Sequence, residues 1–521
     1  MNSDMDDPDQ ECFWLYNYLY YIPNDCAVLP MRDLSEIFEP VCSRDEIEAI
    51  EQLLDAPLME RAGLAAAQFV RDTLAAGKVL VLAGPGNNGG DALVAARHLR
   101  SWWIDVTLVF TGNPQKLPVD AARAYREWLD CGGNCHQAIP RQDKWDLVID
   151  GLFGTGLKRP LADGYKTMVD TVNALGIPIL SIDMPSGVDS DTGTVPGAAV
   201  KAAHTLTFIA LKPGLLTSDG LDHCGSVHLD TLGLDTPALR KPQGWVSNSK
   251  IVAASFRRRP RNSHKGTFGS TAIIGGSKGM LGAALLAARA ALKLGSGKVF
   301  LRALDDFEVD PVQPEIMMRD AAEAMEASTF VIGPGLGKSE AARHLVERAL
   351  LSKSALVIDA DALNLIAQDA KLQQALIGRA GIAVLTPHPA EAARLMGCSI
   401  PEIQKDRIAA ATGLVRKFGC PIVLKGAGSI CAFLDGKWVI NASGNPGLAQ
   451  AGMGDVLSGM MGAFLSQGLF LEDALLCAVY LHGAAAENLS LAGVGPMGMT
   501  ASELIDASRA LLNKIVENGL K

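Results

Sequence analysis

Short apolar runs alternate with amphipathic stretches along much of this chain, and no other feature limits its possible folds so strongly. The runs in the first part of the chain lie at 79–82, 106–110, 147–150, 179–183, 205–211 and 226–229. Helical stretches separate the first of these runs, at 91–99 and 121–129. Alternation of this kind is typical of a parallel sheet whose connecting helices cover its faces. The first part is therefore predicted to form an α/β domain.

The alternation stops between Pro237 and Pro260, where prolines, polar residues and a cluster of arginines interrupt it, and then begins again. A helix is predicted at 283–294. The later apolar runs lie at 271–274, 299–301, 330–332, 356–358, 384–385, 422–424, 430–434 and 438–440. We find no sequence repeat that relates the two parts. We therefore expect two different α/β domains, at residues 34–239 and 240–521.

Composition narrows the partners that the chain could have. Its formal net charge of −10 argues against a broad nucleic-acid surface. The ten cysteines form no CxxC pair, which favours reduced thiols and a cytoplasmic location over a disulfide framework or a zinc site. The apolar stretch at 13–22 is too short to span a bilayer, and acidic residues precede it. Residues 1–33 form an extension with two interpretations, a packed aromatic arm or a segment before a true start at Met31.

Glycine-rich and polar segments follow three of the predicted strands in the first part, at 84–91, 150–156 and 181–189. Because carboxyl ends of parallel strands meet at one crevice, their side chains should face a common ligand. The candidates for that position are Asn88, Asp150, Asp183 and Ser186. Their oxygen atoms suit a hard cation, and the glycine backbone can approach a phosphate closely. The segment 84–91 lacks the Lys-Ser/Thr pair of a P-loop. For Asp183 taken alone, the alternative is a structural role as a helix cap or in a turn.

Together these segments resemble the N-terminal domain of the bifunctional NAD(P)H-hydrate repair enzymes, the NAD(P)H-hydrate epimerase, over residues 34–234. The resemblance implies a Rossmann-like parallel sheet and a potassium ion held by Asn88, Asp150 and Ser186. It also implies that Asp183 acts on the substrate near the reacting ring. The residues implied to contact the hydrated dinucleotide are Asn87, Asn88, Gly89, Gly90, Asp91, Gly154, Thr155, Gly156, Leu157, Lys158, Arg159, Pro160 and Asp183. Ala92 replaces a glycine that is common in relatives.

The strongest motif of the second part lies at 445–459, where Gly452 and Gly454 precede Asp455 at the start of an apolar helix. Free backbone N–H groups at such a helix start can hold a transferring phosphoryl group, and Asp455 can accept a proton from the attacking hydroxyl. The alternative is that Asp455 only caps the helix. The segment 333–339 imitates a Walker motif. However, Ile332, which precedes it, stands where the first glycine of that motif belongs, so we reject a P-loop.

The motifs HKGTFG, GPGLG, DADALN, TPHPAE, LKGAGS and GMGD together resemble the ribokinase-like superfamily, and specifically its ADP-dependent NAD(P)H-hydrate dehydratase, over residues 245–512. The resemblance implies that ADP phosphorylates the C6 hydroxyl of the hydrate with Asp455 as base, and that phosphate then leaves. It implies magnesium with the nucleotide. The hydrate would contact Ala283, Gly335, His388 and Asp455. The residues implied to contact ADP are Lys425, Gly426, Ala427, Gly428, Ser429 and Gly454. Ala390 replaces a glycine that relatives often carry.

The sequence therefore predicts a bifunctional isomerase and lyase. One domain would interconvert the two epimers of hydrated NADH and NADPH, and the other would dehydrate the S form while ADP becomes AMP and phosphate. We expect these small molecules as partners, no nucleic acid or membrane, and a homo-oligomer. Two alternatives remain open, a ribokinase-like small-molecule kinase fused to a nucleotide-binding domain, and a non-catalytic N-terminal module. No residue distinguishes ADP from ATP.

Overall fold

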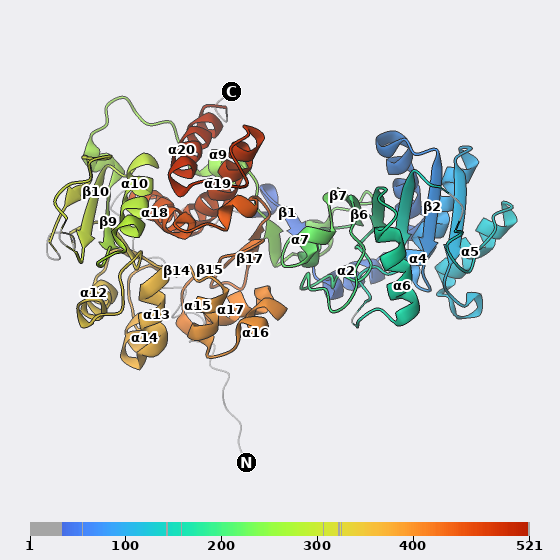
Figure 1. The fold of residues 1–521 in the computed structure, drawn as a ribbon, viewed down its shortest axis with the longest axis horizontal. Coiled ribbons are helices and arrows are strands. Elements are labelled where there is room, and N and C mark those ends of the chain that lie inside the picture. The colour runs from blue at the N-terminus through green and yellow to red at the C-terminus, as the bar shows by residue number, and fades with distance from the viewer. Residues whose placement is uncertain are drawn as a thin grey trace, which may run out of the picture.

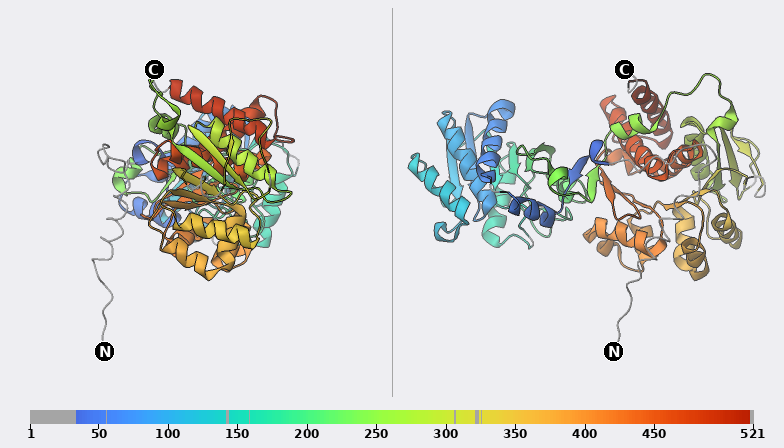
Figure 2. Two further views of the ribbon diagram at one scale, coloured as in Figure 1. Left: turned by 90° about the vertical axis from the view of Figure 1, so that its left-hand side faces the viewer. Right: turned by 180° about the vertical axis from the view of Figure 1, so that it is seen from behind.

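The computed structural model describes residues 34–54, 56–141, 144–157, 159–305, 307–320, 324 and 326–518. They form two α/β bodies, one built mainly from the first half of the chain and one from the second (Figure 1). The same division is visible from behind (Figure 2). The extension at 1–33 and the predicted contact residue Lys158 lie outside the described residues.

The first body contains a six-stranded parallel sheet, as its alternating sequence predicts. In spatial order its strands are β3 (Asp105–Phe110), β2 (Lys78–Ala83), β4 (Leu147–Gly151), β5 (Ile179–Ile182), β6 (His204–Phe208) and β7 (Ser226–Asp230). Side chains of β2 alternate between two cores, because successive residues of a strand point to opposite faces. The helices of the first core are α2 (Arg44–Gln52), α3 (Leu58–Phe69), α4 (Asn87–Ser101) and α5 (Val119–Asp130), and that of the second is α6 (Asp163–Asn173).

The second body contains a mixed sheet of eleven strands. In spatial order they are β1 (Glu39–Val41), β8 (Gly244–Val246), β17 (Trp438–Asn441), β16 (Ser429–Ala432), β15 (Ile422–Leu424), β14 (Ala383–Leu385), β13 (Ala355–Ile358), β12 (Thr329–Ile332), β9 (Ser270–Gly275), β10 (Lys298–Ala303) and β11 (Met317–Met318). The strands from β15 to β11 are parallel, whereas β16 pairs antiparallel with both β15 and β17. The consecutive strands β16 and β17 therefore form a hairpin.

Helices cover both faces of this larger sheet (Figure 1). The helices on one face are α9 (Lys250–Ser255), α10 (Leu281–Lys293), α18 (Met453–Ser466), α19 (Leu471–Leu491) and α20 (Ala501–Asn518). The helices on the other face are α12 (Glu340–Leu351), α13 (Ala360–Gln368), α14 (Ala370–Ile377), α15 (Pro389–Met396), α16 (Ile400–Lys405) and α17 (Arg407–Phe418). In β12, Val331 points to the first face, whereas Phe330 and Ile332 point to the second. The α/β class expected for both parts is confirmed.

Helix α19 is long and apolar enough to cross a membrane by length and composition. However, 67% of its most apolar window is buried inside the protein. Its buried residues belong to the same core as those of α10 and α18. We therefore interpret α19 as a core helix of the second body.

Every predicted apolar run overlaps a strand, but the structure departs from the expected organisation at the boundary between the bodies. The stretch 237–260, which we interpreted as a break in the pattern, contains β8 and α9. Strand β1, which we assigned to the first domain, pairs antiparallel with β8 in the larger sheet, with Glu39 opposite Val246. Both strands have three residues, too few for an alternating pattern to reveal them.

Candidate active sites

The first cluster of predicted residues lies at the carboxyl ends of β4 and β5. Asp150 is fully buried, and its carboxylate accepts hydrogen bonds from the Ser186 backbone N–H (2.9 Å) and hydroxyl (2.6 Å). The Ser181 hydroxyl (2.9 Å) and the Leu152 N–H (3.2 Å) also donate to it. Burial raises the pKa of Asp150, and these donors oppose the shift. The structure thus brings together two of the three residues predicted to hold potassium.

Asn88, the third predicted potassium ligand, lies in the first turn of α4. That helix begins at Asn87, before the predicted start at Asp91, so the glycine-rich segment forms a helical turn. Glycine is required there because a Cβ on Gly89 would lie 2.0 Å from the carbonyl oxygen of Gly84. Among the described residues, neither the side-chain oxygen nor the nitrogen of Asn88 has a hydrogen-bond partner, although both are buried.

The unpartnered amide of Asn88 and the carboxylate of Asp183 flank Gly154. A Cβ on Gly154 would lie 3.3 Å from Asn88 Oδ1 and 3.2 Å from Asp183 Oδ2. A buried oxygen without a donor is available to a cation, so Asn88 fits a hard monovalent ion in ligand chemistry. Asp150 fits less directly, because its oxygens already accept four hydrogen bonds. Of the loop that follows Gly154, Gly156, Arg159 and Pro160 are exposed.

Asp183 forms a buried ion pair that the sequence did not predict. Its carboxylate lies 2.5 Å from Lys212 Nζ, and the Lys212 side chain is only 1% exposed. Lys212 Nζ also donates to Thr207 Oγ1 and to the Phe208 carbonyl, both at 2.8 Å. Asp183 itself has a φ of +64°, a backbone conformation that is uncommon outside glycine. Asp183 follows β5 and Lys212 follows the neighbouring strand β6, so both residues lie at the carboxyl ends of adjacent parallel strands.

Two further carboxyl groups surround this ion pair. Burial and the charges of Asp183 and Glu51 hold the pKa of Asp91 well above its usual range, while Lys212 opposes the shift. Burial and the charge of Asp183 likewise raise the pKa of Glu51, which lies on α2. One lysine therefore lies among three acidic groups, and the pKa values of two of them, Asp91 and Glu51, are raised.

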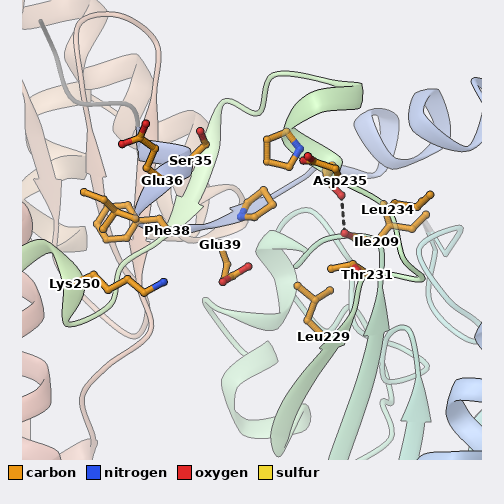
Figure 3. A pocket seen from close by; sticks show the side chains of 14 residues that line it. Ser35, Glu36, Phe38, Glu39, Ile209, Leu229, Thr231, Leu234, Asp235 and Lys250 are labelled. Atoms are coloured by element: carbon orange, nitrogen blue, oxygen red, sulfur yellow. Dashed lines mark hydrogen bonds between the residues drawn. The ribbon is translucent and has the colours of Figure 1, made fainter.

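A pocket of about 320 Å³ lies between the two bodies (Figure 3). Phe38 and Glu39 line it from the β1 segment, Asp235 from the end of the first body, and Lys250 from α9. None of the described residues that we predicted for either site lines this pocket. It therefore adds no candidate ligand to either cluster.

The second cluster is built on a buried lysine at the carboxyl edge of the larger sheet. Lys425, directly after β15, places its Nζ 2.6 Å from Asp359 Oδ1, and Asp359 directly follows β13. The hydroxyl of Ser458 on α18 donates to the other carboxylate oxygen of Asp359 at 2.5 Å. Asp359 is the first residue of the DADALN motif, and in the structure its carboxylate connects Lys425 to α18.

Asp455 lies in the first turn of α18, next to this ion pair. The chain enters the helix through Gly452 with a φ of +88°. Burial and the negative charge of Asp359 raise the pKa of Asp455 to about 7, while Lys425 opposes the shift. No side-chain hydrogen bond caps α18, so the alternative that Asp455 serves as the helix cap is not supported. Gly454 leaves space beside the lysine, since a Cβ there would lie 3.3 Å from Lys425 Nζ.

His388 and Glu391 extend the cluster at the start of α15. His388 Nδ1 accepts a hydrogen bond from the Ala390 N–H at 3.1 Å. Glu391 is buried with Oε2 4.0 Å from Lys425 Nζ, and burial raises its pKa to about 7. Burial and the charge of Lys425 lower the pKa of His388. His388 is therefore neutral at neutral pH and presents a half-exposed imidazole to the site.

The loop predicted to contact ADP is shaped by glycines and held by a buried arginine. Gly426 and Gly428 have φ values of +140° and +65°, which favour glycine. The guanidinium of Arg407, on α17, donates to the carbonyls of Lys425 and Gly428, both at 3.3 Å. Its Nε donates at 2.9 Å to Thr217 Oγ1, which belongs to the first body. Thr217 Oγ1 in turn donates to the Ala427 carbonyl at 3.1 Å.

The structure also brings together Ala283 and Gly335, two residues predicted to contact the hydrate. Gly335 has a φ of +58°, and a Cβ there would lie 3.2 Å from the Cβ of Ala283. The loop continues to Gly337, whose N–H donates to Asp361 Oδ2 at 2.9 Å. No group of three or more acidic, histidine or cysteine side chains among the described residues is arranged to hold a metal ion.

Two family profiles match the chain. The profile described as NAD(P)H-hydrate dehydratase matches residues 271–509, and the profile described as YjeF-related protein N-terminus matches residues 55–214. Each matched range contains one of the two clusters. The two ranges do not overlap, so the clusters correspond to separate family regions.

Curated relatives match over nearly their whole length. The bifunctional NAD(P)H-hydrate repair enzyme Nnr of Escherichia coli is 40% identical over 477 residues, which cover 88% of this chain and 89% of the relative. The bifunctional NAD(P)H-hydrate repair enzyme of Leishmania braziliensis is 36% identical over 504 residues, covering 88% and 90%. Among solved structures, the ADP/ATP-dependent NAD(P)H-hydrate dehydratase of Bacillus subtilis, co-crystallised with ATP/Mg²⁺, is 32% identical with a TM-score of 0.47. It covers 51% of this chain and 97% of its own.

Proposed function

Because this chain belongs to the family of bifunctional NAD(P)H-hydrate repair enzymes, we propose that residues 34–239 carry the epimerase and residues 240–521 the ADP-dependent dehydratase. The observation that carries this division is that each body has its own buried lysine–aspartate pair at the carboxyl edge of a parallel sheet. Lys212 pairs with Asp183 in the first body, and Lys425 pairs with Asp359 in the second. Two reactions can therefore proceed on one chain without sharing a site.

For dehydration, we assign the base to Asp455. Its carboxylate takes the proton of the C6 hydroxyl while that oxygen attacks the β-phosphorus of ADP, and AMP leaves. The C6–O bond then breaks, phosphate leaves with the bonding electrons, and loss of a proton from the neighbouring ring carbon restores the double bond. Backbone N–H groups at the start of α18 can stabilise the charge of the transferring group. A pKa of about 7 keeps Asp455 partly ionised at neutral pH.

Magnesium is proposed to arrive with the nucleotide. The described residues offer no metal site of three or more side-chain ligands, and Mg²⁺ commonly binds through phosphates with one or two carboxylates. Asp455 is the carboxylate that fits, because the oxygens of Asp359 already accept from Lys425 and Ser458. When bound, the ion would neutralise charge on the phosphates. We further propose that Lys425, Gly426, Ala427, Gly428, Ser429 and Gly454 hold ADP, and that Ala283, Gly335 and His388 hold the hydrate.

For epimerisation, we assign proton transfer to the Asp183–Lys212 pair. We assign inversion at C6 to a route in which the hydroxyl leaves as water and returns on the other face of the ring. The pair can give a proton to the departing oxygen and recover it on return. Asn88, Asp150 and Ser186 remain the proposed potassium ligands, with Asn88 best supported because its oxygen is buried and unpartnered among the described residues. The turn from Asn87 to Asp91 and the loop at 154–160 are proposed to hold the dinucleotide.

One experiment separates this function from a small-molecule kinase. NADPH hydrate of mixed stereochemistry is incubated with the purified protein and either ADP or ATP, and nucleotides, inorganic phosphate and the absorbance of the reduced nicotinamide are followed. Complete conversion to NADPH with equimolar phosphate is expected. A stable phosphorylated hydrate would support the kinase instead. Conversion that stops when one epimer is consumed would show that the protein has no epimerase activity.

We also propose a cytoplasmic location, supported by the free thiol state of each described cysteine. A homo-oligomer remains our expectation, and the mass of the protein in solution tests it. Both statements are independent of the chemistry assigned above.

A further inference from the structure

A pocket of about 460 Å³ in the second body gathers positive charge that the proposed chemistry does not use. Lys278, Arg302 and Arg348 line it, together with His344 and the serines Ser277 and Ser339. None of the described residues that line it is acidic. A pocket with this composition is suited to an anion that carries more than one charge.

The pocket lies on the same edge of the sheet as the dehydratase cluster. Lys278 follows β9, Arg302 is the penultimate residue of β10, and Ser339 follows β12. Asp359 follows β13, and the spatial order of the strands is β13, β12, β9, β10. Three steps of about 4.8 Å between neighbouring strands separate β13 from β10 by roughly 14 Å. A dinucleotide, which is two nucleosides joined through a pyrophosphate, can bridge such a separation.

The loops that connect the two places are those predicted to contact the hydrate. Gly335 packs against Ala283, and the Ser277 hydroxyl at the rim of the pocket would lie 3.1 Å from a Cβ on Gly337. Gly337 in turn bonds to Asp361, on the α13 helix that begins beside Asp359. A substrate that reacts at Asp455 and crosses this loop therefore reaches the cationic pocket.

Lysine and arginine side chains of the pocket lack an acidic partner among the described residues. The ion pairs found among the described residues include none made by Lys278, Arg302 or Arg348. Among the described residues, the Nε of Arg302 is buried without a hydrogen-bond partner, and another nitrogen of the guanidinium donates to the carbonyl of Ala303. His344 faces Glu340 and Glu347 at 3.5 and 3.6 Å. A buried guanidinium nitrogen without an acceptor points to an anionic ligand.

We propose that this pocket binds a phosphate group of the hydrated dinucleotide while the nicotinamide ring lies at Asp455. The proposal rests on the proposed function, because it concerns the same substrate. Two groups of the substrate have this chemistry. The pyrophosphate is common to the NADH and NADPH hydrates, and the 2′-phosphate occurs only on the NADPH hydrate.

The test removes two exposed charges from the rim and leaves the half-buried Arg302 in place, so that folding is preserved. The double variant Lys278→Gln/Arg348→Gln is compared with Arg509→Gln/Lys514→Gln, which removes the same charge from exposed positions on α20. KM and kcat for the two hydrates and KM for ADP are measured in the full-length protein. We expect the KM of at least one hydrate to rise about tenfold in the pocket variant, with kcat and the KM for ADP unchanged.

The two hydrates identify the phosphate. An equal rise for both assigns the pocket to the pyrophosphate, and a rise for the NADPH hydrate alone assigns it to the 2′-phosphate. Unchanged KM values for both hydrates, or a rise in the KM for ADP instead, would overturn the proposal while leaving the proposed function intact. Failure of the unmodified protein to dehydrate either hydrate would instead remove the proposed function.

Discussion

Substituting Asp455 with asparagine tests the chemistry of the dehydratase at a single oxygen atom. Asp455→Asn keeps the shape of the side chain and removes its ability to accept a proton. No side-chain hydrogen bond caps α18, so the substitution should leave the helix start unchanged. Loss of a general base commonly costs about 10²- to 10⁴-fold in rate. We therefore expect kcat/KM for the hydrate to fall by at least about a hundredfold, with little change in the affinity for ADP.

The pH profile of the unmodified enzyme carries the same information. Burial and the charge of Asp359 raise the pKa of Asp455 to about 7, so the carboxyl is protonated and inactive as a base below that pH. Because the ionised form is the active one, kcat/KM should fall about tenfold from pH 8 to pH 6. Glu391 has a pKa raised to about 7 as well, so Glu391→Gln is measured alongside. The acidic limb should persist in that variant.

The assay follows recovery of reduced nicotinamide with ADP across pH, on one preparation that is also assayed for epimerisation without nucleotide. Circular dichroism confirms that the variant is folded. An Asp455→Asn enzyme that retains nearly full dehydration would refute the assignment of the base. A profile that stays level down to pH 5 in the unmodified enzyme would show that no group with a pKa of about 7 acts as the base.

Four further outcomes test the remaining assignments. Lys212→Met should lower epimerisation by at least about a hundredfold while dehydration of the S hydrate stays unchanged; equal loss of both activities would contradict separate sites. Epimerisation should slow in buffer without potassium, and Asn88→Leu should abolish that response; rates independent of the ion would remove it from the account. Asp150→Ala should lose most epimerase activity but keep dehydration, as measured on one preparation. Thr217→Val removes the hydroxyl between Arg407 and the ADP loop, so the KM for ADP should rise about two- to tenfold. The control is Thr205→Val, which removes a hydroxyl that donates to the Cys224 carbonyl and should leave the KM for ADP unchanged.

The sequence predicted those parts of the fold and sites that depend on local pattern or on the edge of a parallel sheet. Apolar runs revealed the strands because a buried parallel strand is apolar along its whole length. Asp150, Asp183 and Ser186 were predicted together because each follows or ends a strand of one sheet. The helix start at Asn87 was missed, since glycines disfavour helices unless a close approach requires them, as the contact of Gly89 with Gly84 does.

Long-range contacts account for what was missed. Lys212 stands 29 residues beyond Asp183, and Arg407 stands 190 residues beyond Thr217, so no spacing rule connects either pair. The sequence did contain a signal for Lys212. It is the one charged residue in the stretch 205–216, and it follows β6, the neighbour of the strand that precedes Asp183. For Arg407 there was none, because a helical arginine is ordinarily a surface residue and only the folded structure shows it buried.

We propose that two sites on one chain act in sequence on a substrate that diffuses between them. The most direct measurement mixes two inactive variants, Asp183→Asn and Asp455→Asn, with mixed NADPH hydrate and ADP. The first variant alone should stop once the S epimer is consumed, and the second alone should only interconvert the epimers. The mixture should convert all of the hydrate to NADPH. If the mixture stops where Asp183→Asn stops, or if either variant lacks both activities, the division of labour between the two bodies is contradicted.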